Sequence, residues 1–144
     1  MDQALTAPPA TVSELMTREP IIVRADAPLS DAARLLDAHR VHGLPVVDET
    51  GVLVGVVSQT DLLRARTTEH LWASWRGLKV RHLMSSPALT VSSDASLPEA
   101  AVRMEENQVH RLVVLASDGV SPIGIVSTTD IVRAMLQEAG DERA

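Results

Sequence analysis

Apolar and polar residues alternate in the same way in two stretches of the chain. Each stretch has four apolar residues at the i, i+3, i+4 and i+7 positions of an amphipathic helix: Leu29, Ala32, Ala33 and Leu36, then Leu97, Ala100, Ala101 and Met104. Short apolar runs flank each helix, at 21–23, 44–47 and 52–57 and again at 89–91, 112–115 and 123–126. Ser, Thr and Asp near Thr60-Asp61 and Thr129-Asp130 favour the start of a closing helix. The pattern predicts the order β-α-β-β-α, twice.

The two stretches are copies of one unit. Four segments recur in order: 12–16 as 80–84, 26–33 as 94–101, 41–44 as 109–112, and 55–65 as 124–134. The spacing is 68 residues from Asp26 to Asp94 and 69 from Asp61 to Asp130. A unit of about sixty residues buries only about 60% of its unfolded surface and is marginally stable alone. We therefore expect an α/β protein in which two repeats share a core.

Several motifs together resemble the cystathionine-β-synthase (CBS) domain, present as a tandem pair over residues 12–137. They are the Leu-Met lead-ins at 15–16 and 83–84, His-Gly-Leu-Pro-Val-Val-Asp at 42–48, and Gly-Val-Val-Ser-Gln-Thr-Asp at 55–61. The resemblance implies CBS domains at 11–66 and 80–137, a connector at 67–79, and tails at 1–10 and 138–144 that we expect to be disordered or frayed. It also implies that the units pack through their sheets by pseudo-twofold symmetry, with ligand clefts at the seam, and that the protein forms a homodimer.

The Ser-x-Thr-Asp segments are the strongest candidates for ligand binding. A helix N-terminus offers unpaired N–H groups and positive potential, and a carboxylate accepts two hydrogen bonds from a ribose diol. By resemblance, Ser58, Thr60 and Asp61, like Ser127, Thr129 and Asp130, hold the ribose and nearby polar atoms of an adenosine ligand. The alternative is that these residues only cap helices.

The two sites are not equally equipped. In the family, basic residues near His42-Gly43 and His110-Arg111 approach ligand phosphates, and only Arg111 offers a bidentate clamp; the alternative for Arg111 is a solvated surface charge. Ser86 precedes Pro87 where Glu19, a carboxylate that repels phosphate, precedes Pro20. The better site is therefore expected to comprise Ser86, Val91, Val109, His110, Arg111, Ser127, Thr129 and Asp130. The doubtful site comprises Val23, Val41, His42, Gly43, Ser58, Thr60 and Asp61.

Composition excludes several function classes. The net charge is −6 without a basic cluster, and Phe and Tyr are absent, which disfavours nucleic-acid binding. There is no cysteine for thiol chemistry, and the longest apolar run, 52–57, is too short for a membrane span. The N-terminus lacks the pattern of a signal peptide, so we expect a cytoplasmic protein. His39 and His42 have helical metal-ligand spacing but no evident third ligand, so no metal is expected.

No catalytic motif is present: there is no Gly-x-Ser-x-Gly elbow and no Gly-x-x-x-x-Gly-Lys loop. We expect a non-enzymatic regulatory module without an obligatory cofactor. It would bind AMP, ADP, ATP or S-adenosylmethionine and signal through its dimer arrangement to an unidentified regulated protein. One alternative is a scaffolding dimer with vestigial empty clefts, and another is a small enzyme or metalloprotein. Trp72 and Trp75, the only aromatic residues, either cap the shared core or form a subunit contact.

Overall fold

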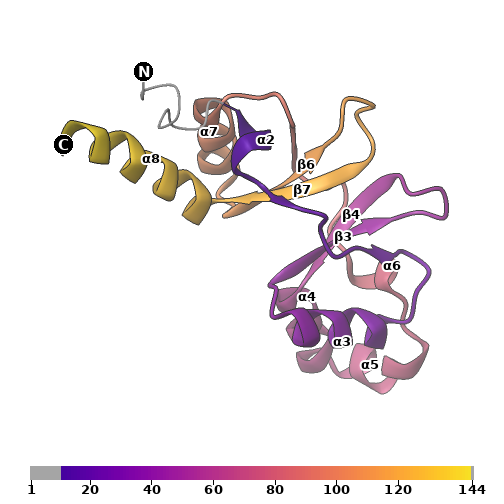
Figure 1. Ribbon diagram of the computed structural model, residues 1–144. Helices are drawn as coiled ribbons and strands as arrows, with labels where there is room; N and C mark the ends of the chain where they lie inside the picture. The colour runs from indigo at the N-terminus through magenta and orange to yellow at the C-terminus, as the bar shows by residue number, and fades with distance from the viewer. Residues whose placement is uncertain (1–10, 144) are drawn as a thin grey trace. The chain divides into compact units, whose positions relative to one another are not determined.

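The computed structural model describes the backbone of residues 11–143 and the side chains of residues 11–137 (Figure 1). Two compact units are present. The first-repeat unit comprises Pro20–Ala88 and Val120–Pro122. The second-repeat unit comprises the chain up to Glu19, Leu89–Gly119, and the chain from Ile123 onward. Each unit holds one small sheet and its helices, which confirms the α/β class and the repeated β-α-β-β-α order.

The first-repeat unit is built on a three-stranded sheet in the order β2-β3-β4. Strand β2 (Val23–Arg24) runs parallel to β3 (Gly43–Val47), which pairs antiparallel with β4 (Leu53–Ser58). Helix α3 (Leu29–His39) buries the predicted apolar positions Leu29, Ala32 and Leu36 against this sheet. Helix α4 (Gln59–Thr67) starts directly at the end of β4, so the Ser-x-Thr-Asp segment lies at a strand-to-helix junction.

The second-repeat unit has a four-stranded sheet in the order β1-β7-β6-β5. Strand β5 (Thr90–Ser92) is parallel to β6 (Arg111–Leu115), and β7 (Pro122–Ser127) leads into α8 (Thr128–Arg143). Helix α7 (Leu97–Asn107) buries Leu97, Ala100 and Met104. The fourth strand, β1 (Thr17–Arg18), was not predicted from the sequence; it pairs antiparallel with β7, Thr17 opposite Ile125.

The lead-in helix of each repeat packs in the unit of the other repeat. Helix α2 (Val12–Leu15) precedes the first repeat, yet Val12 is fully buried in the second-repeat core, and its N–H donates to the Ala95 carbonyl at 2.9 Å. Helix α6 (Val80–Leu83) does the reverse: Val80 is buried in the first-repeat core and donates to the Ala27 carbonyl at 2.9 Å. The two cores therefore do not follow the repeat boundaries.

A glycine in each sheet allows the chain that follows a lead-in helix to approach closely. A Cβ added at Gly55 would lie 2.7 Å from the Ser85 carbonyl oxygen, and two backbone hydrogen bonds between Ser85 and the neighbouring Val56 hold the two segments together. A Cβ at Gly124 would lie 2.9 Å from the Thr17 oxygen and would collide with the Met16 side chain. Gly55 and Gly124, each three residues before a Ser-x-Thr-Asp segment, are thus required by packing.

Three further findings concern the predicted boundaries. The backbone of residues 138–143 continues α8, where the sequence predicts a C-terminal tail. Residues 1–10 lie outside the described part of the chain. The connector contains α5 (Glu69–Ala73) and the 3₁₀ turn η1 (Trp75–Gly77). None of the helices within residues 11–143 has the length and apolar character needed to cross a membrane.

Candidate functional site

The first Ser-x-Thr-Asp segment forms a reciprocal cap at the start of α4. The Ser58 N–H and hydroxyl donate to Asp61 Oδ2 at 2.8 and 3.0 Å, and the Asp61 N–H donates to Ser58 Oγ at 3.3 Å. The Asp61 side chain is only 7% exposed. The helix-cap alternative therefore describes a real part of the role of these residues, and Ser58, not Thr60 or Asp61, is the cap.

The second segment repeats this geometry at the start of α8. The Ser127 N–H and hydroxyl donate to Asp130 Oδ2 at 2.8 and 3.0 Å, and the Asp130 N–H donates to Ser127 Oγ at 3.2 Å. The Asp130 side chain is 14% exposed, twice the fraction of Asp61. Both carboxylates are thus held in place before any ligand binds, and Asp130 is the more accessible of the two.

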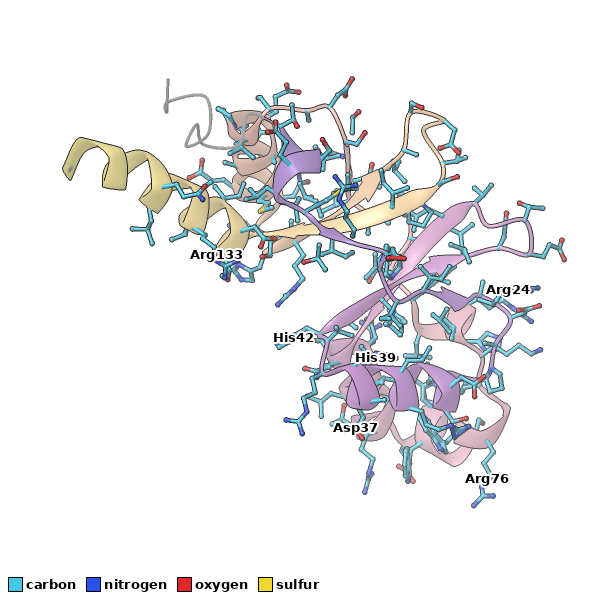
Figure 2. All side chains as sticks on the ribbon, viewed as in Figure 1. Arg24, Asp37, His39, His42, Arg76 and Arg133 are labelled. Atoms are coloured by element: carbon cyan, nitrogen blue, oxygen red, sulfur yellow. The ribbon has the colours of Figure 1, made fainter. Side chains whose placement is uncertain are left out.

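An arginine lies three residues after each aspartate, but only the first of the two forms a hydrogen bond with its carboxylate. In the first segment Arg64 donates to Asp61 Oδ1 at 3.0 Å and also to the Leu83 carbonyl at 3.2 Å. In the second, Arg133, which projects from α8 (Figure 2), lies 3.7 Å from Asp130 Oδ1. That distance is beyond ordinary hydrogen-bond length. The outward oxygen of Asp130 is therefore less engaged.

Each of the two predicted histidines, His42 and His110, contacts the start of a site helix through its backbone carbonyl. The carbonyl of His42 accepts from the Gln59 N–H, and that of His110 from the Thr128 N–H, both at 2.9 Å. Each bond fixes the loop before a strand against the first turn of a helix. Both histidine side chains are exposed, as are Thr60 and Thr129.

Position 43 and Arg111 occupy equivalent strand starts. Arg111 begins β6 and is exposed. Gly43 begins β3 directly opposite Ser58 in the register with β4. A Cβ there would meet the Val57 oxygen at 3.5 Å, an ordinary contact, so the position tolerates a side chain. The first site lacks a cation at this position because of its sequence and not because of its packing.

Other predicted site residues are distributed unevenly. Ser86 lies in the first-repeat unit, with Asp61, and its hydroxyl donates to the Val54 carbonyl at 2.8 Å. Val23 and Val91 are core residues, 6% and 8% exposed, so only their backbones are available to a ligand. Val41 and Val109 are half-buried.

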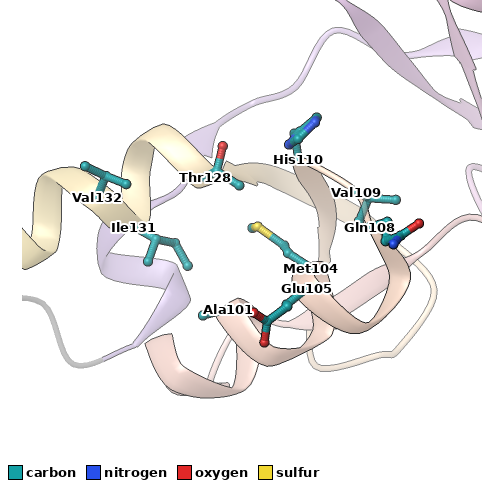
Figure 3. Close-up of a pocket in the computed structure, with 9 residues that line it drawn as sticks. All are labelled: Ala101, Met104, Glu105, Gln108, Val109, His110, Thr128, Ile131 and Val132. Carbon is teal, nitrogen blue, oxygen red and sulfur yellow. The ribbon is translucent and has the colours of Figure 1, made fainter.

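A pocket of about 550 Å³ lies between α7 and α8 within the second-repeat unit (Figure 3). It includes the predicted Val109 and His110. Met104 and Ile131 point into the space between the two helices (Figure 3). Sequence reasoning missed the other lining residues, which are Ala101, Met104, Glu105, Gln108, Thr128, Ile131 and Val132. Ala101 and Met104 fit the apolar face of a helix, and that pattern does not distinguish a core position from the wall of a pocket.

His39 and His42 are the two histidines with helical metal-ligand spacing. His39 ends α3 and His42 follows in the loop before β3 (Figure 2). Across residues 11–137, no three His, Asp or Glu side chains gather closely enough to hold a metal ion.

The two tryptophans form one cluster in the connector. Their ring centroids are 5.4 Å apart, and the Arg66 guanidinium lies 4.7 Å from the Trp72 ring centroid. Trp75 is half-buried against the first-repeat core, whereas Trp72 is 42% exposed. The core-capping interpretation therefore fits Trp75, and Trp72 is the member of the pair that faces solvent.

Comparison with known families matches the CBS domain model to residues 12–67 and 80–137. The chain belongs to the CBS domain family. The CBS domain-containing protein CBSX1 of Arabidopsis thaliana, named as chloroplastic, is 32% identical over 162 aligned positions, which cover 93% of this chain and 68% of CBSX1. CBS-pair proteins are generally regulatory modules, although some relatives carry the names of enzymes, such as an L-aspartate semialdehyde sulfurtransferase of Methanocaldococcus jannaschii.

Solved CBS structures resemble this chain over nearly its whole length. The structure of CBSX2 in complex with AMP has a TM-score of 0.78 and 35% identity, covering 91% of this chain and 99% of the other. The CBS domain pair of MJ0100, in complex with 5′-methylthioadenosine and S-adenosyl-L-methionine, has a TM-score of 0.73 and 26% identity, covering 87% and 98%. The ligands in these two structures share an adenosine moiety, and only AMP carries a phosphate.

Proposed function

We propose that this CBS pair is a regulatory module that binds an adenosine nucleotide or another adenosyl ligand, with the principal site at Ser127–Asp130. The observation that carries the proposal is the capped Ser-x-Thr-Asp turn, in which a preset carboxylate lies at a helix N-terminus. The adenosyl ligands bound in the CBSX2 and MJ0100 structures support the same ligand class. Adenosine is common to those ligands, so the ribose-binding carboxylate matters more than the phosphate contact.

Each residue of the principal site has a distinct part. Asp130 would accept the two ribose hydroxyls, mainly through Oδ1, because Oδ2 already accepts from Ser127. Thr129 offers an exposed hydroxyl in the first turn of α8, where the helix dipole favours anions. Arg111 would clamp a phosphate when the ligand has one, with His110 beside it. Val109 provides half-buried apolar surface beside the base.

The proposed output is a shift between arrangements of a homodimer. A ligand changes such an equilibrium only by its difference in affinity for the two states. Leu63 on α4 and four large apolar side chains on α7 and α8 are between 50% and 66% exposed. The four on α7 and α8 are candidates for the subunit contact: Val102, Val132, Met135 and Leu136. A regulated partner protein would read the arrangement, and the module itself would carry out no reaction. The proposal includes a cytoplasmic location, to be checked by fractionation because CBSX1 is named chloroplastic.

Calorimetric titration with AMP, ADP, ATP and S-adenosylmethionine tests this function, with thermal stabilisation as a second measurement. At 100 times Kd, a ligand should add about 2.7 kcal/mol to the free energy of unfolding. Asp130→Ala should abolish binding at the principal site, whereas Asp37→Ala, at an exposed position on α3, should leave it intact. If none of the four compounds binds at millimolar concentration, the sensor function is wrong.

A scaffolding dimer with empty clefts is the second candidate. The observation that favours it is that both aspartates already serve as partners in helix caps, so their presence has a structural explanation. This function predicts a dimer whose melting temperature is indifferent to every adenosyl compound tested.

A further inference from the structure

Arg64 makes two hydrogen bonds that together hold it across the first-site carboxylate. One Nη2 atom donates to Asp61 Oδ1 at 3.0 Å and to the Leu83 carbonyl at 3.2 Å. Leu83 is the last residue of α6, whose Val80 and Leu83 are buried in the same core. The acceptor at Leu83 is therefore fixed, and it orients a guanidinium that is otherwise 56% exposed.

These contacts leave neither oxygen of Asp61 free. Oδ2 accepts from the Ser58 N–H and hydroxyl, and Oδ1 accepts from Arg64. A carboxylate has about four lone-pair sites, so three are used before a ligand arrives. A ribose diol donates two hydrogen bonds. The Asp61 carboxylate can accept both of them only if Arg64 releases Oδ1.

The second repeat offers a matched comparison at the same spacing. Arg133 is also three residues after its aspartate, but its Nη1 is 3.7 Å from Asp130 Oδ1. Among the described residues, Arg133 has no hydrogen bond to a backbone carbonyl that corresponds to the bond of Arg64 to Leu83. The two sites therefore have the same residue, arginine, at this position. They differ in whether a backbone carbonyl holds its guanidinium in place.

We infer that Arg64 competes with the ribose for Asp61, so that the two sites of the CBS pair fill in order, Asp130 first and Asp61 second. This inference rests on the proposed function and adds a specificity-determining residue to it. Arg64 acts on the carboxylate and not on the phosphate, so its effect applies equally to ligands with and without phosphate. The pair responds over a wider range of ligand concentration than two equal sites would.

The decisive measurement is calorimetric titration with AMP in a background that isolates the first site. Asp130→Ala removes the second site, and in that background Arg64→Leu keeps an apolar stem but removes the guanidinium. We expect Arg64→Leu to tighten AMP binding about tenfold, the effect of one charge-assisted hydrogen bond. The matched variant Arg133→Leu, made in an Asp61→Ala background, should change AMP affinity at the second site less than threefold.

Adenosine serves as the second probe and Arg64→Lys as the second variant. Because the competition is for ribose, adenosine should gain the same factor as AMP from Arg64→Leu. Lysine keeps the charge but lacks the guanidinium, whose Nη2 makes both bonds, so the AMP affinity of Arg64→Lys should be intermediate. Melting temperatures of the variants establish that each is folded.

The outcomes separate the two ideas. If wild-type protein binds AMP at two equal sites, or if Arg64→Leu leaves the first site unchanged, the competition by Arg64 is wrong while nucleotide binding stands. If AMP, ATP and S-adenosylmethionine bind to neither wild-type protein nor any variant, the proposed function itself fails.

Discussion

The hydroxyl of Ser127 donates to Asp130 Oδ2 at 3.0 Å, and the backbone N–H of Asp130 returns a bond to that hydroxyl at 3.2 Å. The pair therefore caps α8 and presets a carboxylate at the same time. A substitution at either residue affects stability and ligand binding together, and the two effects have to be measured separately.

Asp130→Asn separates them. Asparagine keeps an oxygen that can accept from Ser127, so the free energy of unfolding should fall by less than about 1 kcal/mol. The loss of the negative charge and of one ribose acceptor should weaken adenosine binding at least tenfold. Chemical denaturation and calorimetry measure the two quantities, and an unchanged affinity would remove Asp130 from the site.

Gly43→Arg should give the first site the cation that it lacks. A side chain fits there, since a Cβ at Gly43 makes only ordinary contacts, the nearest at 3.5 Å. We expect AMP to bind the first site about tenfold more tightly, because a guanidinium forms charge-assisted bonds with phosphate. Adenosine is the control ligand, and its affinity should not change. An equal gain for both ligands would contradict a phosphate contact at position 43.

Gly55→Ala should destabilise the protein by about 1–3 kcal/mol, through overpacking. The new methyl group would lie 2.7 Å from the Ser85 carbonyl oxygen, which is held by its bond from the Val56 N–H. Gly77→Ala is the matched control, because nothing lies within 4 Å of a Cβ there. Urea denaturation compares the two, and equal stabilities would mean that the β4 region relaxes without cost.

Asp48 should give the β3–β4 turn a pH-dependent stability. Its carboxylate accepts from the Thr50 hydroxyl at 2.7 Å and from the Val52 and Thr50 N–H groups, which lowers the pKa of Asp48. A lowered pKa contributes stability that is present above the unfolded value of about 3.9 and is lost as pH falls through the folded value. The difference in melting temperature between wild type and Asp48→Asn should therefore shrink below about pH 4. Thr50→Val should raise the pKa of Asp48 in an NMR titration.

Met135→Glu combined with Val132→Glu should dissociate the proposed homodimer. Both side chains are more than half exposed on α8, and a buried unpaired carboxylate at a subunit contact is costly. Sedimentation velocity should find dimers for wild type and monomers for the double variant. Ile22→Glu, at a 43% exposed apolar position in the first-repeat unit, is the control and should remain dimeric. A monomeric wild type would contradict the subunit contact.

Periodicity and the repeat were enough to predict most of the fold. Helices α3 and α7 begin at the predicted Leu29 and Leu97, and the later strands of each repeat lie within a residue or two of the predicted runs. The four-residue helices α2 and α6 are too short for a helical period to be detected. Their exchange between cores could not be predicted either. Because Val12 and Val80 stand in equivalent motifs, the sequence does not indicate which of the two cores each lead-in helix joins.

The sequence predicted the residue types of the two sites and an asymmetry between Gly43 and Arg111, but not the difference between Arg64 and Arg133. The Ser-x-Thr-Asp turns have the capped geometry expected of a helix start, and their use by a ligand stays a prediction. Arg64 and Arg133 have identical spacing from their aspartates, so the sequence treats them alike. Only the Leu83 carbonyl, brought near by the packing of α6, distinguishes them. That contact joins residues nineteen positions apart through tertiary structure.

The exchanged lead-in helices give the protein a fixed order of events on the ribosome. Helix α2 is translated well before Leu112 and Val126, which belong to the same core as Val12. Helix α6 follows its own core at once, so the first-repeat unit can close while the second is still being made. During that interval Val12 and Met16 stay exposed on the nascent chain.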